Sequence, residues 1–226
     1  MTLKKCFAEA IGTFALVFAG TGAIVINDVS SGAVSHVGIA PTFGLIVLAM
    51  IYTVGDLSGA HLNPAVTLGF WFSGRFPKSL IMPYVASQCF GAFVASGVLR
   101  LLFPAHPTLG TTLPAGPELQ SFVLELILTF ILMFVILNVS TGAKEKGITA
   151  GIAIGSVIAL EAMFAGKICG ASMNPARSLA PALVSGHVEH LWLYLVAPVL
   201  GAALAIFACR SCQEAGCCPL PKAQRG

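Results

Sequence analysis

The chain has 226 residues, of which 57% are hydrophobic and only 9% are charged, and its formal net charge is +3. Because soluble domains carry about 25% charged residues, this composition excludes a soluble enzyme, a nucleic-acid-binding protein and a disordered chain. It indicates an integral membrane protein. The long apolar runs do not alternate with polar residues, which favours helices over the strands of a barrel.

Six apolar runs are each long enough to cross a bilayer as a helix of about 20 residues. We expect spans over residues 6–26, 37–54, 79–103, 118–137, 148–165 and 191–209. A shorter apolar piece follows the second and the fifth run, at residues 64–72 and 175–184. Such a piece is too short to span, and it predicts a re-entrant segment whose backbone is surrounded by protein or by a watery cavity.

The two halves of the chain match each other in sequence. Residues 7–14, FAEAIGTF, resemble residues 123–130, VLELILTF, and residues 58–65, SGAHLNPA, resemble residues 169–176, CGASMNPA. Because each half has three spans, the second half must enter from the opposite face of the membrane. The sequence therefore predicts an inverted repeat, with functional sites near the midplane where the repeats meet.

The basic residues predict that both termini are cytoplasmic, because cytoplasmic loops carry an excess of Lys and Arg. In that orientation nine of the twelve basic residues are cytoplasmic, namely Lys4, Lys5, Arg75, Lys78, Lys144, Lys146, Arg210, Lys222 and Arg225. Arg100, Lys167 and Arg177 fall toward the outer face. We expect a multi-pass protein of the cell membrane, either a plasma or an inner membrane.

An Asn-Pro-Ala tripeptide stands at the start of each short apolar piece, with the asparagine directly before it. The two copies are Asn63, Pro64 and Ala65, and Asn174, Pro175 and Ala176. Asparagine is a preferred helix cap and proline a preferred first helical residue, so each copy should begin a short helix. The two helices should meet with their N-terminal ends, each carrying about half a positive charge. We expect these ends to form a barrier against protons and cations.

The asparagine amides add a second element to this barrier. If each side-chain oxygen accepts the cap bond, the amide N–H groups can face a lumen. We hypothesise that a water molecule that accepts from both Asn63 and Asn174 is then unable to relay a proton along a file. The backbone carbonyls before each asparagine also need partners, which permeating molecules could supply. These residues are Gly59, Ala60, His61 and Leu62 in the first half and Gly170, Ser172 and Met173 in the second.

Two stretches carry a resemblance to a known family. Residues 58–67, SGAHLNPAVT, and residues 170–178, GASMNPARS, resemble the two signatures of the aquaporin (major intrinsic protein) family, and the likeness runs from about residue 5 to residue 208. The second stretch is most similar to the nodulin-26-like branch and its bacterial relatives. The resemblance implies an all-α membrane protein with six transmembrane helices and two re-entrant half-helices in an inverted repeat. It also implies a pore in each protomer and a homotetramer in the lipid bilayer.

From this resemblance we expect one aquaporin-like channel domain over residues 1–210, followed by a cytoplasmic tail over residues 211–226. The first repeat should cover about residues 5–103 and the second about residues 118–209. Four cysteines, Cys209, Cys212, Cys217 and Cys218, follow or end the last span. Thiolates suit soft metals such as zinc or arsenite, but the spacing is not that of a standard zinc motif and no histidine is nearby. We therefore favour a plain tail and expect no cofactor.

Glu9 and Glu125 are carboxylates inside predicted spans, where a charge is costly and marks a functional position. An intramembrane enzyme would use them as acid and base. The resemblance implies instead that they bond the backbone of the re-entrant loops, and their matching positions in the repeat favour this role. Glu161 also lies within a span, and the sequence gives it no role.

Arg177, three residues after Asn174, keeps its charge under all conditions. The resemblance implies that it stands at an outer constriction, where it donates to the solute and repels cations. The same resemblance assigns Phe43, Ala162 and Ala171 to this filter. Water channels of the family usually have histidine at the position of Ala162, so alanine predicts a wider and more apolar ring.

We therefore expect a passive channel for water and small uncharged solutes, with glycerol and undissociated metalloid acids such as arsenite or boric acid as candidates. Protons, ions and nucleic acids are not expected partners. Ser178, Ala182 and Phe43 favour the alternative of a strictly water-selective channel. An ion-coupled transporter would need a charged relay at the midplane, where this sequence offers amides, and an enzyme would need a nucleophile or a metal site that the spans lack.

Overall fold

The computed structural model describes residues 2–140 and 144–212, with the side chains of residues 144–148 excepted. Over these residues the chain forms eight α-helices and one short 3-10 helix. In chain order the elements are α1 (Thr2–Val29), α2 (Ser35–Ser58), α3 (Pro64–Phe72), η1 (Lys78–Leu80), α4 (Ile81–Leu102), α5 (Glu118–Val139), α6 (Lys144–Cys169), α7 (Pro175–Ser185) and α8 (Leu191–Cys212).

Six of these helices are long and apolar enough to cross a membrane, which confirms the predicted fold class. The two short helices, α3 and α7, begin at the predicted prolines. Five of the six long helices extend beyond the predicted apolar runs because polar residues continue the backbone hydrogen bonds, whereas α4 begins at Ile81, after η1, and ends at Leu102. The helix that differs most over its two ends is α6, which begins at Lys144 rather than at residue 148 and ends at Cys169 rather than at residue 165. Lysine and glutamate are good helix formers, so the segment expected to be a loop is helical.

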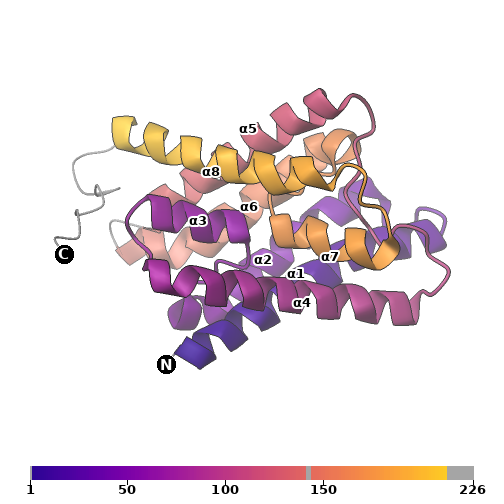
Figure 1. Cartoon of the computed structure of the whole chain (residues 1–226), viewed down its shortest axis with the longest axis horizontal. Coiled ribbons are helices and arrows are strands. Elements are labelled where there is room, and N and C mark those ends of the chain that lie inside the picture. Colours follow the sequence, from indigo (N-terminus) through magenta and orange to yellow (C-terminus); the bar gives the residue numbers. More distant parts are fainter. Residues whose placement is uncertain (1, 141–143, 213–226) are drawn as a thin grey trace.

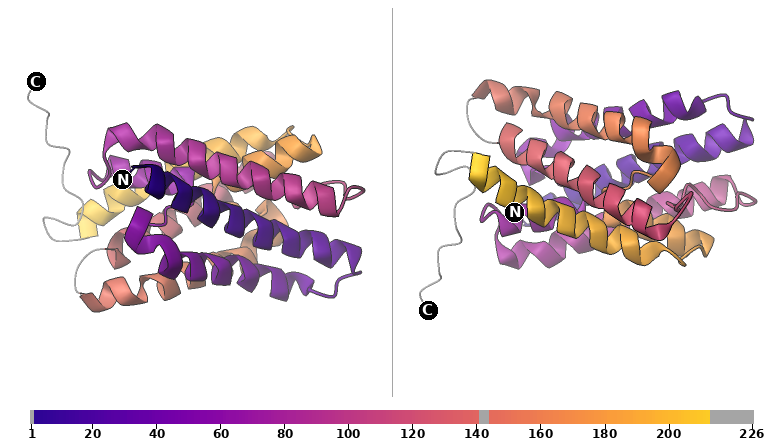
Figure 2. Two further views of the ribbon diagram at one scale, coloured as in Figure 1. Left: turned by 90° about the horizontal axis from the view of Figure 1, so that it is seen from below. Right: turned by 90° about the horizontal axis from the view of Figure 1, so that it is seen from above.

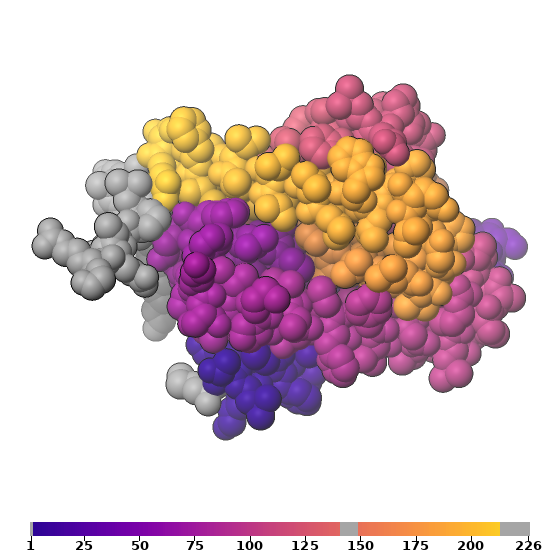
Figure 3. Space-filling view, in the orientation of Figure 1, coloured from indigo at the N-terminus to yellow at the C-terminus, as the bar shows by residue number. Residues whose placement is uncertain are grey.

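The long helices form one bundle in which α3 and α7 follow one another between α4 and α8 (Figure 1). The described chain starts and ends at the same end of this bundle, as the two side views in Figure 2 also show. The space-filling view in Figure 3 shows α7 seated between α4 and α8 on one face. Large apolar side chains such as Phe90 and Phe207 are exposed on the outside of the bundle, as a surface that meets lipid requires.

Glycines at equivalent positions of the two halves let the helices approach closely. A methyl group at Gly91 of α4 would overlap the carbonyl group of Ala10 in α1, and one at Gly201 of α8 would overlap that of Leu126 in α5. Small residues at such crossings are typical of packing between membrane helices. The same close helix contact therefore occurs in both halves of the inverted repeat.

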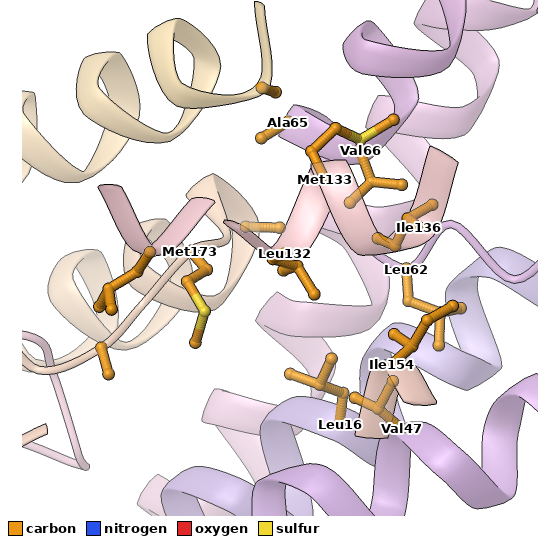
Figure 4. Packing of buried hydrophobic residues seen from close by; sticks show 14 of the residues in the cluster. Leu16, Val47, Leu62, Ala65, Val66, Leu132, Met133, Ile136, Ile154 and Met173 are labelled. Carbon is orange, nitrogen blue, oxygen red and sulfur yellow. The ribbon is translucent and has the colours of Figure 1, made fainter. Parts of the chain in front are cut away.

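The helices α2 and α6 meet through Gly44 and Gly155, each of which lies against the backbone carbonyl of the other. Apolar side chains from several helices then converge inside the bundle. Figure 4 shows Leu16, Val47 and Ile154, from α1, α2 and α6, together with Leu62 of the segment before α3. The residues directly before α3 and α7 are buried inside this bundle.

Candidate functional site

The asparagines cap the two short helices through their side-chain oxygens. Both have extended backbone, and Asn63 Oδ1 accepts from the N–H of Ala65 at 2.8 Å. Asn174 Oδ1 accepts from the N–H groups of Ala176 at 3.0 Å and Arg177 at 3.3 Å. Proline follows at the first helical position in each case, where its missing N–H costs nothing. Local chemistry thus fixes where each half-helix starts.

The two capping amides join the loops to each other. Asn63 Nδ2 donates to the carbonyl of Met173 at 2.7 Å, and Asn174 Nδ2 donates to the carbonyl of Leu62 at 2.9 Å. The N-terminal ends of α3 and α7 therefore lie face to face. A side-chain amide has two N–H donors, so each asparagine keeps a second donor beyond this link.

Both loops have the same unusual backbone. In the first loop Gly59, Ala60 and Leu62 have φ values of 90°, 46° and 52°. The second loop repeats the pattern, and its residues are Gly170 with a φ of 86°, Ala171 with 41° and Met173 with 53°. A left-handed conformation is costly for residues other than glycine, so the surrounding structure must hold both loops in place.

Two buried carboxylates provide part of this support. Glu9 accepts from the backbone N–H groups of His61 at 2.9 Å and Leu62 at 2.7 Å. Glu125 accepts from those of Ser172 at 2.7 Å and Met173 at 2.8 Å. Both glutamates are fully buried, so neither oxygen pair reaches solvent. These bonds satisfy backbone N–H groups of the two loops, which are not paired within any helix.

A cavity of about 130 Å³ runs past the meeting point of the loops. Its polar wall contains both asparagines, Arg177 and the loop residues Gly59, Ala60, His61, Leu62, Ala171, Ser172 and Met173. Its apolar wall consists of Leu16, Phe43, Val47, Ile51, Val66, Phe70, Leu132, Ile136, Ala150, Ile154 and Ile158. One face thus offers hydrogen bonds and the other offers none, which suits solutes with a polar and an apolar side.

Arg177 and Phe43 lie together at one level of this cavity. The guanidinium carbon lies 5.2 Å from the centre of the Phe43 ring, and Nη1 donates to the carbonyl of Gly110 at 2.9 Å. Arg177 is only 2% exposed. Among the described residues, Ala171 also lines the cavity whereas Ala162, buried on α6, does not. Gly170 is likewise absent from this lining.

Several residues of this region were missed from the sequence. The carbonyl of Gly110, which holds Arg177, belongs to the loop between α4 and α5, and no side chain signals it. Thr112 of the same loop donates to Ser178 Oγ at 2.8 Å. The apolar wall could have been predicted from the sequence, because its residues on α5 and α6 recur at every fourth position inside the spans.

Two other predicted features stand apart from the cavity lining. Both carboxylate oxygens of Glu161 are buried, and no partner for them is found in the described part of the chain. Cys209 is buried and Cys212 exposed, and Cys217 and Cys218 lie outside the described residues. Residues 2–140 and 144–212 contain no cluster of histidine, cysteine and carboxylate side chains able to hold a metal.

The sequence model of the major intrinsic protein family matches residues 1–209. The chain belongs to the major intrinsic protein family. It is 50% identical to aquaporin NIP1-1 of Zea mays over 207 residues, which cover 91% of this chain and 73% of that protein. It is 49% identical to nodulin-26 of Glycine max over 201 residues, which cover 88% of this chain and 74% of that protein.

The fold of this aquaporin-family chain is also found in a solved structure. The crystal structure of the aquaglyceroporin from Plasmodium falciparum matches with a TM-score of 0.84 at 26% identity, covering 92% of this chain and 96% of that one. These similarities confirm the predicted family and its nodulin-26-like branch. The protein is a multi-pass membrane channel for water and small neutral solutes, and it is not an enzyme.

Proposed function

We propose that this aquaporin-family channel conducts glycerol as well as water through a filter made by Phe43, Ala162, Ala171 and Arg177. The observation that carries the proposal is the guanidinium of Arg177 lying 5.2 Å from the Phe43 ring, with no imidazole at the position of Ala162. The alanine side chain is too short to fill the ring. Arg177 supplies the donors and Phe43 the apolar contact.

The amphipathic cavity supports a solute with carbon on one side and hydroxyl groups on the other. Beyond the filter, such a solute would slide its carbon chain along Val47, Ile154 and Ile158 while the loops contact its hydroxyl groups. A water molecule uses the same polar wall. Undissociated boric and arsenous acids have the same neutral hydroxyl character and are further candidate solutes.

The exclusion of protons and cations would come from the two half-helix ends. Their partial positive charges face each other, and each asparagine amide keeps one donor for the lumen. A water molecule held by Asn63 and Asn174 accepts from both and cannot hand a proton along the file. Arg177 adds a full positive charge at the filter.

Orientation and assembly belong to the same proposal. Both described ends lie at one end of the bundle, and the sequence predicts that nine of the twelve basic residues are cytoplasmic, which supports cytoplasmic termini. A homotetramer with one pore per protomer, in a plasma or inner cell membrane, fits the apolar outer surface. The channel domain would end near residue 210, and residues 211–226 would form the tail.

Ala162→His tests the solute range. An imidazole would narrow the filter and add a polar partner, so glycerol permeability should fall several-fold while water permeability is largely kept. Ala162→Ser is the matched control, because it adds a hydroxyl group with little volume. Stopped-flow light scattering on proteoliposomes, with glycerol and an impermeant osmolyte as the two gradients, measures both rates.

The same experiment tests the strictly water-selective alternative, which the Phe43 ring and Ser178 favour. In that case the wild-type vesicles would shrink rapidly in glycerol and fail to re-swell. Such a result would overturn the inference drawn from Ala162. Re-swelling of the wild type and of Ala162→Ser, but not of Ala162→His, is the expected result.

A further inference from the structure

We propose that His106 is a positioning residue that holds Arg177 in place through the backbone of residues 109 and 110 and makes conduction sensitive to pH. This inference rests on the proposed filter role of Arg177. His106 lies in the loop between α4 and α5 and is only 6% exposed. It does not line the central cavity, so its effect would pass entirely through the loop.

The contact chain starts at the histidine ring. The backbone N–H of Leu109 donates to His106 Nδ1 at 3.0 Å. The next residue, Gly110, offers the carbonyl that accepts from Arg177 Nη1 at 2.9 Å. A single peptide group therefore separates the histidine bond from the arginine bond.

The backbone at this point needs to be held. Leu109 has a φ of 52° and Gly110 a φ of 71°, both in the left-handed region. Leucine adopts this conformation only at an energetic cost, which its neighbours must offset. Gly110 also packs so closely on Thr21 of α1 that a methyl group would find Thr21 Cβ at 2.9 Å. The hydrogen bond that His106 accepts thus helps to orient the Gly110 carbonyl toward Arg177.

The bond to Leu109 selects the tautomer of the neutral ring. A nitrogen that accepts a hydrogen bond carries no proton, so Nδ1 is bare and the proton of the neutral ring is on Nε2. His106 Nε2 lies 3.3 Å from the carboxylate of Asp28, at the end of α1. The charged groups that contact His106 are Asp28 and Arg100 of α4, whose Nη1 donates to the His106 carbonyl at 2.7 Å.

A second proton on the ring would break this arrangement. Both ring nitrogens of an imidazolium ion are donors, so the N–H of Leu109 would face another N–H. The side chain of Asp28 is 52% exposed to solvent, and its carboxylate would stabilise the charged ring. Arg100 would keep the His106 backbone where it is, so the bond to Leu109 is the one lost.

Loss of that bond would release the Gly110 carbonyl. Among the described residues, this carbonyl is the acceptor that the structure gives the Arg177 guanidinium, whose Nε has no partner. A guanidinium without its acceptor would turn its donors into the lumen and narrow the filter. Acidification should therefore lower the glycerol permeability.

The test uses the full-length protein in proteoliposomes, buffered equally on both sides at values from about pH 7.5 to about pH 5, where histidine changes charge. Glycerol permeability of the wild type should fall several-fold toward the acidic end. His106→Asn keeps an acceptor near the position of Nδ1 and cannot titrate, so its flux should stay high throughout. His106→Ala has no acceptor and should be slow at every pH.

His190→Asn is the matched control. His190 lies in the loop between α7 and α8 and is paired with Glu118 at 2.6 Å, and the described residues show no hydrogen bond or ion pair between its side chain and residues 106–110. Its pH profile should equal that of the wild type. Asp28→Asn removes the partner of the charged ring, so a more acidic medium should be needed for the same loss of flux.

Two results would overturn the proposal: a wild-type pH response in His106→Asn, or no pH response in the wild type. Water permeability is measured on the same vesicles. If glycerol proved impermeant, the solute range proposed above would fail, while the pH profile of water flux in these variants would still decide the role of His106.

Discussion

The first re-entrant loop, residues 59–63, is held mainly by side chains from inside the bundle. Besides two backbone N–H groups, Glu9 accepts from Ser58 Oγ at 2.7 Å and from Gln88 Nε2 at 2.8 Å. The hydroxyl of Tyr84 donates to the carbonyl of Ser58 at 2.8 Å. Four donors thus converge on one buried carboxylate.

The second loop, residues 170–174, has the same backbone with fewer such supports. Cys169 replaces Ser58, and Pro198 stands at the position equivalent to Gln88. Tyr194 is the counterpart of Tyr84, but its buried hydroxyl has no partner in the described part of the chain. Glu125 accepts from the two backbone N–H groups of its loop, and the weakly donating thiol of Cys169 also interacts with it.

The loop between α4 and α5 supplies the missing support from outside. Thr112 donates to Ser178 Oγ at 2.8 Å, and that hydroxyl also contacts Ser172 Oγ of the second loop. The N–H of Ala115 donates to the carbonyl of Ile168 at 2.9 Å. The first repeat is thus held from within the bundle, whereas the second, which carries Arg177, is held in addition by the loop between α4 and α5.

The largest expected effect comes from removing each carboxylate in turn. A glutamine at position 9 or 125 has only one acceptor oxygen, so buried donors lose their partner at about 1–3 kcal/mol each. Because Glu9 serves four donors, Glu9→Gln should lower the thermal unfolding midpoint in detergent more than Glu125→Gln does. Glu189→Gln, at an exposed position, is the control. Equal losses for the first two variants would contradict the comparison.

Glycine-to-alanine substitutions on α1 distinguish residues that support the first loop from residues that determine solute selectivity. A methyl at Gly20 would overlap the Phe43 ring and push it toward the lumen, whereas one at Gly12 would meet the flexible end of Leu62. Gly20→Ala should therefore lower the ratio of glycerol to water permeability several-fold, and Gly12→Ala should change it less. Gly97→Ala, with open space around it, should leave the ratio unchanged. A larger change from Gly12→Ala would show that the first loop also selects.

The smallest expected effect concerns the two equivalent tyrosines. Tyr84→Phe removes a buried hydrogen bond and should cost about 1 kcal/mol of stability. Tyr194→Phe removes a hydroxyl without a protein partner in the described structure, so it should be neutral or slightly stabilising. Thermal unfolding in detergent measures both. A loss at Tyr194 equal to that at Tyr84 would indicate a bound water there.

The parts of this protein that could be predicted from sequence are those set by local chemistry. Bilayer thickness fixes the length of the spans, and Asn-Pro fixes the start of α3 and α7, so both were found. The start of α6 at Lys144 was missed because a charged segment at a membrane face can be loop or helix. Arg177 was singled out by its place three residues after Asn174 and by the family resemblance, whereas nothing in the sequence distinguished the Gly110 carbonyl, because every residue has one. Phe43 and Ala162 came from the family resemblance, and their roles stay predictions.

The two amide links across the pore also have a consequence for biosynthesis. The bond from Asn63 to Met173 joins residues 110 positions apart, and that from Asn174 to Leu62 joins residues 112 positions apart. While the ribosome is still making the second half, the first loop has neither partner. We expect this loop to stay unfixed in the membrane until α7 arrives, so that neither half, made alone, would assemble a finished pore.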